Sequence, residues 1–182
     1  MHVRLSTCRG AGVVDRSGEG IGTLAGILLH PDTGKVEGLF VAVPAGMFAT
    51  EEPFCAAEDV VHWGAMVQIS NRDALAPVED RIRLVPLLAE GRTILGQPIR
   101  TESGRILGIC KDVQFDTEKM KLEWLFPKKC FRWGVALPVS DVVEVRRDAV
   151  IVREGLKTET MAAVEKQPVS YEAFPEIVGQ AS

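Results

Sequence analysis

A repeat within the chain constrains its fold more than any other feature. When the sequence is compared with itself at an offset of 86 positions, nine of the 34 positions from 7 to 40 carry the same residue, whereas chance gives about two or three. The repeated residues are Thr7, Gly10, Ser17, Gly18, Gly22, Lys35, Glu37, Leu39 and Phe40. The offset then falls to 82, so that 59–61 aligns with 141–143 and Ile69 aligns with Ile151. Two copies of one module therefore account for most of the chain.

Each copy is predicted to be β structure. In the second copy apolar and polar residues alternate on both sides of a turn at 116–119. The predicted inward residues are Leu107, Ile109, Val113, Phe115, Met120, Leu122, Trp124 and Phe126, and the predicted outward residues are Asp112, Gln114, Asp116, Lys121 and Glu123. Such alternation predicts a β-hairpin. The first copy has its turn at 30–34, where Gly34 can adopt the left-handed conformation. Gly22 and Gly108 lie inside the preceding strands, where a missing side chain permits a bulge or a sharp bend.

Short strands with turn signals between them predict an all-β protein made of two small β-barrels. The predicted organisation is copy 1 at 1–75, a linker at 76–90, copy 2 at 91–153 and an acidic tail at 154–182. Pro86 argues against a long helix in the linker. The stretch 156–166 of the tail is compatible with a short helix.

The turn residues of both copies resemble those of a known family. Val13, Val14 and Asp15, followed by Gly18 and Gly22, resemble a PRC-barrel domain, and the second copy repeats the pattern over 99–108. This family includes the cytoplasmic domain of the photosynthetic reaction-centre H subunit and the C-terminal domain of a ribosome maturation factor. The resemblance implies a tandem of two PRC-type barrels, no catalytic residues, and a role in docking onto a protein partner.

Composition limits the class of protein further. The apolar fraction of 46% is ample for a packed core, and a net charge of −4 excludes a chain that is basic throughout. The sequence has no secretory signal and no apolar run long enough to span a membrane. We therefore expect a cytoplasmic protein whose four cysteines, Cys8, Cys55, Cys110 and Cys130, are free thiols.

No motif in the sequence points to catalysis, so we expect a protein that is not an enzyme and has no cofactor and no metal. The glycine-rich stretch 18–22 precedes a predicted strand, whereas a phosphate-binding loop precedes a helix. The carboxylate pairs 15/19 and 112/116 are typical of turns and polar strand faces. Cys55 and His62 are the one pair of residues whose types and spacing are compatible with metal ligands. We prefer the interpretation that Cys55 is a buried thiol and His62 a surface histidine.

Charge separates the two copies. Residues 1–80 carry a net charge of −6, residues 81–153 carry +5 and residues 154–182 carry −3. In the second copy, basic residues are interleaved with aromatic ones in one loop, whereas the matching loop 44–53 of the first copy is acidic. The residues of this candidate partner-binding loop are Lys128, Lys129, Phe131, Arg132 and Trp133. Such a loop can contact an acidic protein surface, or bind phosphate and stack bases.

The leading hypothesis is therefore a non-enzymatic adaptor that binds an unidentified protein. An RNA-associated factor like the ribosome maturation family is the alternative, and a small-molecule or metal-binding barrel is a weaker one. Two further interpretations of the loop stay open. Phe131 and Trp133 can cap the barrel while the cations stay in water, or the acidic first copy can dock on the basic second copy. Trp124 and Phe126 are predicted to lie in the core. The oligomeric state is left open.

Overall fold

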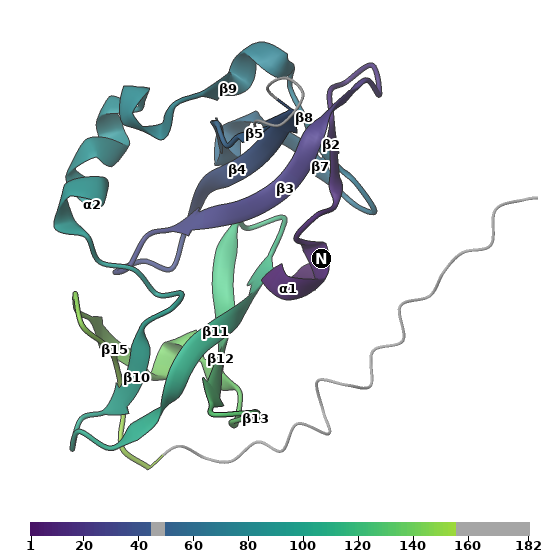
Figure 1. The fold of residues 1–182 in the computed structure, drawn as a ribbon. Helices are drawn as coiled ribbons and strands as arrows, with labels where there is room; N and C mark the ends of the chain where they lie inside the picture. Colours follow the sequence, from purple (N-terminus) through teal and green to yellow (C-terminus); the bar gives the residue numbers. More distant parts are fainter. Residues whose placement is uncertain (45–49, 156–182) are drawn as a thin grey trace, which may run out of the picture.

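The computed structural model describes residues 1–44 and 50–155 of the chain, and these residues are mostly β structure. They form two strongly curled sheets, one from each half of the sequence, which lie one above the other in Figure 1. The expected short helix at 156–166 and residues 45–49 of the acidic loop lie outside the described residues. Among the described residues, no helix is long and apolar enough to cross a membrane.

The first sheet has the strand order β7-β8-β2-β3-β4-β6-β9, with β5 paired to β4. Its strands and 3₁₀ turns are β2 (Gly12–Val14), β3 (Gly20–Leu29), β4 (Val36–Pro44), β5 (Thr50–Glu51), β6 (Phe54–Ala56), η1 (Ala57–Asp59), β7 (Val60–Trp63), β8 (Val67–Ile69), η2 (Arg72–Ala74) and β9 (Leu75–Ala76). The long hairpin β3–β4 forms the centre of this sheet, and the parallel pair β2–β8 curls it back on itself.

The second sheet has the order β13-β12-β11-β10-β16-β15, with β1 and β14 paired to β11 and β12. Its elements are β1 (His2–Arg4), α1 (Leu5–Cys8), β10 (Pro98–Thr101), β11 (Ile106–Asp116), β12 (Lys121–Lys129), β13 (Arg132–Trp133), β14 (Leu137–Pro138), η5 (Val139–Asp141), β15 (Val142–Val145) and β16 (Val150–Val152). The N-terminal strand β1 thus adds to the sheet of the other half of the sequence.

The two sheets have corresponding strand pairings. In each, a short strand pairs antiparallel with a long hairpin and parallel with a later strand, as β2 does with β3 and β8, and β10 with β11 and β16. Val13 pairs with Val67, whereas Ile99 pairs with Val150, so the offset between β8 and β16 is 83. The alignment of Ile69 with Ile151 is therefore wrong by one residue, because the β15–β16 turn is one residue longer than the β7–β8 turn.

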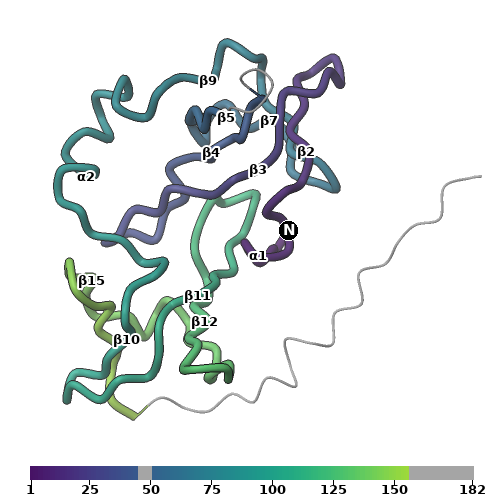
Figure 2. The backbone as a smooth tube through the Cα atoms, viewed as in Figure 1, coloured from purple at the N-terminus to yellow at the C-terminus, as the bar shows by residue number. Residues whose placement is uncertain are grey.

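The two halves do not have separate cores, as two independent barrels would. One cluster of buried side chains runs through both sheets, and it includes the T-shaped pair Trp63 and Phe115, whose ring centroids are 5.2 Å apart. The turns of the two long hairpins also meet (Figure 2), where Lys35 and Lys121 form an antiparallel bridge. Lys121 is 86 positions after Lys35, so this bridge joins matching positions of the two halves.

The alternation predicted for β11 is confirmed at Val113 and Phe115 and is wrong at Ile109, Asp112 and Asp116. The two aspartates, expected to face outward, are 1% and 5% exposed because the N-terminal segment covers them. Val113 and Phe115 are fully buried in the shared core. A register shift between Cys110 and Asp112 reverses the earlier part, so Cys110 is buried and Ile109 is 39% exposed. A strict period of two cannot anticipate such a bulge, because the extra residue exchanges the two faces of the strand.

The segment between the two sheets packs against the first of them. It contains η3 (Val78–Asp80), η4 (Ile82–Leu84) and α2 (Val85–Glu90). Leu84 is buried in a small cluster with Phe54 and Ala56. Arg83 donates to Glu37 at 3.1 Å and to Glu58 at 2.9 Å. Residues 76–90 therefore pack on the first sheet and cover part of it. They include the short helix α2, which has Pro86 in its first turn.

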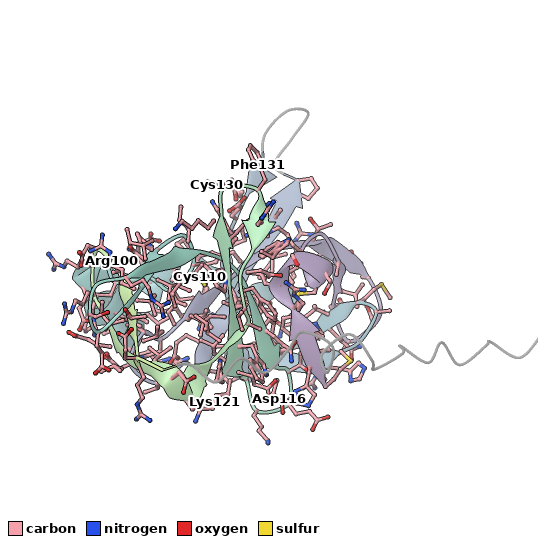
Figure 3. The ribbon with its side chains drawn as sticks, turned by 90° about the horizontal axis from the view of Figure 1, so that it is seen from below. Arg100, Cys110, Asp116, Lys121, Cys130 and Phe131 are labelled. Atoms are coloured by element: carbon pink, nitrogen blue, oxygen red, sulfur yellow. The ribbon has the colours of Figure 1, made fainter. Side chains whose placement is uncertain are left out.

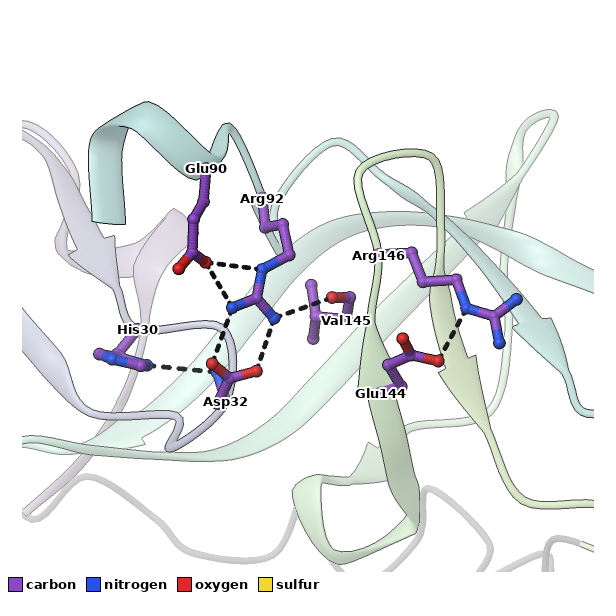
Figure 4. A network of polar contacts seen from close by, with 7 residues as sticks. All are labelled: His30, Asp32, Glu90, Arg92, Glu144, Val145 and Arg146. Atoms are coloured by element: carbon purple, nitrogen blue, oxygen red, sulfur yellow. Dashed lines mark hydrogen bonds and ion pairs between the residues drawn. The ribbon is translucent and has the colours of Figure 1, made fainter. Parts of the chain in front are cut away.

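An arginine after α2 ties three parts of the chain together (Figure 4). Arg92 donates from its two Nη atoms to Asp32 at 2.6 and 2.8 Å, and from Nη1 to the carbonyl oxygen of Val145 at 3.2 Å. It also pairs with Glu90. The hydrogen bonds from Arg92 lower the pKa of the Asp32 carboxyl. Arg92 therefore connects the β3–β4 turn to the second sheet.

Replacing Arg92 by methionine is expected to lower stability near pH 7 and to matter less in acid. Because the folded-state pKa of Asp32 is depressed, this ion pair stabilises the fold above the unfolded pKa of about 3.9, and its contribution is lost as pH falls through the folded pKa. Urea unfolding at several pH values measures the effect. Arg146→Met is the control, because Arg146 pairs with Glu144 within one hairpin. This account would be contradicted if the difference in the free energy of unfolding between Arg92→Met and the parent grew below pH 4.

Candidate interaction surface

The five loop residues selected from the sequence come together in one tight hairpin. Lys128 pairs with Trp133 and Lys129 pairs with Arg132, which leaves Cys130 and Phe131 as a two-residue turn. Cys130 has φ of +53°, as the first position of a type II′ turn requires. Cys130 and Phe131 project together at one end of the second sheet (Figure 3). We call Lys128, Lys129, Phe131, Arg132 and Trp133 the hairpin surface.

The aromatic residues of the hairpin surface face solvent. Phe131 is 96% exposed and Trp133 is 47% exposed. The interpretation that both cap the barrel is therefore wrong for Phe131, because a capping side chain would be covered. Phe126 is buried as predicted, but it lies under Arg4 and belongs to neither cluster of core residues. Trp124 is only partly buried.

Apolar and cationic groups alternate across the hairpin surface. Ile109 pairs with Lys128, which pairs with Trp133, so the three side chains lie side by side on one face of the sheet. The Lys128 ammonium lies 5.2 Å from the centroid of the Trp133 ring. Lys128, Lys129 and Arg132 form no salt bridge with a carboxylate of the described residues, in either half. Their charge is thus available to a partner.

Sequence reasoning missed a fourth cation beside the hairpin surface. Arg4 comes from β1, and its guanidinium carbon lies 3.8 Å from the centroid of Phe126 and 5.6 Å from that of Trp133. Its Nε atom donates to Asp112 at 3.1 Å. Ser6 also donates to Asp112, from its backbone at 2.9 Å and from its hydroxyl at 2.5 Å. No local signal reveals this contact, because more than 100 residues separate Arg4 from Asp112.

Three of the four carboxylates in the pairs 15/19 and 112/116 have structural partners. Asp15 accepts hydrogen bonds from the hydroxyl and backbone of Ser17, and the hydroxyl in particular lowers the pKa of its carboxyl. Asp112 is the buried partner of Arg4. Asp116 accepts from the backbone N–H groups of Glu118 and Lys119, which lowers the pKa of its carboxyl. Each of these carboxylates therefore has a role in a turn or a strand contact.

Among the described residues, one group has side chains of metal-binding type within reach of one another. His2, Asp116 and Glu123 lie on β1, β11 and β12, with ligand atoms within 4.8 Å. The Nδ1 atom of His2 lies 2.8 Å from Glu123. The contact between His2 and Glu123 and the backbone hydrogen bonds to Asp116 account for the positions of these side chains without an ion. Cys55, by contrast, is fully buried in β6 and His62 is exposed on β7, so they do not resemble a metal pair.

All four cysteines are free, and only Cys130 is exposed. Burial raises the pKa of the Cys8 thiol to about 11 and the pKa values of the Cys55 and Cys110 thiols to about 12. Because the thiolate is the reactive form, we expect one fast-reacting thiol with a disulfide reagent at pH 8 and four in denaturant. Cys130→Ser should remove the fast reaction. A second thiol that reacts equally fast in the native protein would contradict this.

Comparison with protein families agrees with the fold of the second half. Residues 88–157 match the family model described as the PRC-barrel domain. This segment contains β10 to β16 and the hairpin surface. A search of curated proteins finds no match to the chain. The family match supports the PRC-barrel resemblance for the second half, and the first half lies outside the matched segment.

Proposed function

We propose that the chain is a tandem PRC-barrel protein, without enzymatic activity, that binds a protein partner through the hairpin surface. The tandem arrangement is supported by the repeated residues and by the corresponding strand pairings of the two sheets. The observation that carries the binding proposal is Phe131, which is 96% exposed at the tip of the β12–β13 hairpin. An exposed aromatic side chain on a hairpin turn is suited to insertion into a pocket of a partner.

The chemistry of the hairpin surface defines the partner. Ile109, on the far side of Lys128 from Trp133, and Val135, two residues after Trp133, are each 39% exposed and add apolar area. Lys128, Lys129 and Arg132 form no salt bridge with described carboxylates, so an acidic rim on the partner would pair with them. Arg4 and Lys128 lie near the Trp133 ring, which leaves less of that ring free for stacking on a base. These features favour an acidic protein surface with an apolar pocket over RNA.

Retention experiments with matched variants test this proposal. Immobilised parent protein should retain a partner from native lysate in a salt-sensitive and ribonuclease-resistant manner. The double variant Phe131→Ser/Trp133→Ser should lose it. Ile82→Ser is the control, because Ile82 is 86% exposed in η4, away from the hairpin. Retention of no protein by the parent, equal retention by both variants, or loss after ribonuclease treatment would each contradict the proposal. The last outcome would favour the RNA-associated alternative.

A further inference from the structure

The two sheets differ at one outer edge. In the first sheet, β6 pairs with β4 on one side and with β9 on the other, where Cys55 lies opposite Leu75. The matching strand of the second sheet is β14, which pairs with β12 as β6 pairs with β4. Among the described residues, no strand pairs with the other side of β14. The second sheet therefore has a free edge at the position that the chain itself covers in the first sheet.

The chain leaves the two sheets in the same way. The N–H group of Ser70, just after β8, donates to the carbonyl oxygen of Asp59 at 2.8 Å. The N–H group of Arg153, just after β16, donates to the carbonyl oxygen of Asp141 at 2.9 Å. β8 and β16 occupy matching positions, and so do η1 and η5, which end at Asp59 and Asp141. The path of the first half is thus a guide to the path that follows β16.

The spacing along the chain predicts which residues would reach the free edge. β9 starts at position 75, six positions after the end of β8 at 69. The same interval after β16, which ends at 152, leads to residues 158–159, outside the described residues. Thr158 and Thr160 are β-branched, as is typical of strand residues. An unpaired edge is also a ready template for one more strand.

We propose that residues 158–159 add to the edge of β14 as β9 adds to β6, and that the tail beyond them covers the hairpin surface. β9 runs antiparallel to β6. In that direction a strand on β14 starts opposite Leu137, passes Ala136 and Val135, and continues towards β13. This follows because β13 and β14 lie on the same side of β12, with β13 earlier in the chain.

The chemistry of the tail matches that of the hairpin surface. Residues 156–182 contain four glutamates and two lysines, and the apolar run 161–164 comes directly after Thr160. In the hairpin surface, Trp133 is 47% exposed, and the three cations form no salt bridge with described carboxylates. In the docked state the apolar run lies against the Trp133 ring, and the glutamates pair with the cations.

The docked tail and a protein partner compete for one surface. This consequence rests on the proposed function, whereas the docking itself does not. A tail that covers the surface for about nine-tenths of the time lowers the apparent affinity of a partner about tenfold. The tail is therefore autoinhibitory, and a partner must displace it.

Amide hydrogen exchange of the full chain, followed by NMR, tests the docking without any partner. In an antiparallel pair, one of two successive N–H groups points towards the neighbouring strand. At least one of the amides of Thr158 and Glu159 should therefore exchange about tenfold more slowly than in a free peptide of residues 156–182. Equal rates in the chain and in the peptide would overturn the proposal.

A proline pair in the full chain tests the position of the tail. Thr158→Pro/Glu159→Pro removes both N–H groups, so the tail should leave β14 and the Trp133 indole signal should shift. Gln180→Pro/Ala181→Pro is the matched control and should leave the Trp133 signal unchanged. An unchanged Trp133 signal in Thr158→Pro/Glu159→Pro, or an equal shift in the control, would overturn docking at this edge.

Competition for the partner tests the regulatory consequence. Soluble Thr158→Pro/Glu159→Pro should release the partner from immobilised parent at about one tenth of the concentration that soluble parent requires. Equal concentrations, with the tail protected from exchange, would overturn the autoinhibition. Retention of no partner by either the parent or the variant would overturn the proposed function, and the exchange result would still decide the docking.

Discussion

Replacing Asp112 by alanine is expected to lower the free energy of unfolding by about 3 kcal/mol or more. The change leaves the charged Arg4 side chain next to a buried cavity, with no carboxylate to pair with it. The Asp112 side chain is 2% exposed, and it accepts hydrogen bonds from Arg4 and from the backbone and hydroxyl of Ser6. Its loss removes the contact that holds the N-terminal segment on the second sheet. Urea unfolding measures the loss, and hydrogen exchange of β1 shows whether this strand is released.

Two further variants separate the charge of Asp112 from its other hydrogen bonds. Asp112→Asn keeps an acceptor for the Ser6 backbone N–H group, so it should cost less than the alanine variant. The double variant Arg4→Met/Asp112→Leu removes both charges and should recover part of the stability lost in Asp112→Ala. If Asp112→Ala unfolds at the same urea concentration as the parent and β1 stays protected, Asp112 does not anchor the N-terminal segment.

Replacing Gly22 by alanine is the second change with a large expected effect. A Cβ atom at Gly22 would lie 2.3 Å from the carbonyl oxygen of Ala42 in the neighbouring strand. Backbone must move to relieve such a contact, and we expect a loss of about 3 kcal/mol. Gly108 occupies the matching position of the second half, and a Cβ atom there would lie 2.9 Å from the carbonyl oxygen of Lys128. The same close approach of two strands thus occurs in both sheets.

Gly20→Ala is the matched control for Gly22→Ala, because Gly20 lies in the same strand and a Cβ atom there meets nothing within 4 Å. We expect its urea midpoint to equal or slightly exceed that of the parent. Far-UV circular dichroism shows whether Gly22→Ala still folds at low denaturant. Equal midpoints for the two variants would show that strand β4 can retreat from Gly22 at no cost.

The local features of the sequence predict much of this fold. The sequence predicts a bulge or bend at Gly22 and Gly108, and both glycines lie beside register shifts in their sheets. The sequence also predicts that the five residues of the hairpin surface lie together, because they fall within six consecutive positions of the chain. Period-two alternation placed Val113 and Phe115 correctly in the core.

Features that depend on contacts distant in the sequence could not be predicted. The pairing of β1 with β11, the role of Arg4, and the burial of Asp112 all join the first residues to the second half. The shared core is not predicted for the same reason. The pattern of each copy predicts a separate barrel, whereas Trp63 of one half packs on Phe115 of the other.

Cross-linking from Cys130 tests the central claim, that the hairpin surface binds a protein, most directly. Cys130 is the exposed cysteine and lies in the turn beside Phe131. A photoreactive maleimide at Cys130 should give one dominant ribonuclease-resistant protein adduct in native lysate. Phe131→Ser/Trp133→Ser, labelled in the same way, should not give this adduct, nor should the double variant Ile82→Cys/Cys130→Ser, which moves the label away from the hairpin. The absence of an adduct from Cys130, or the same adduct from both positions, would contradict the claim.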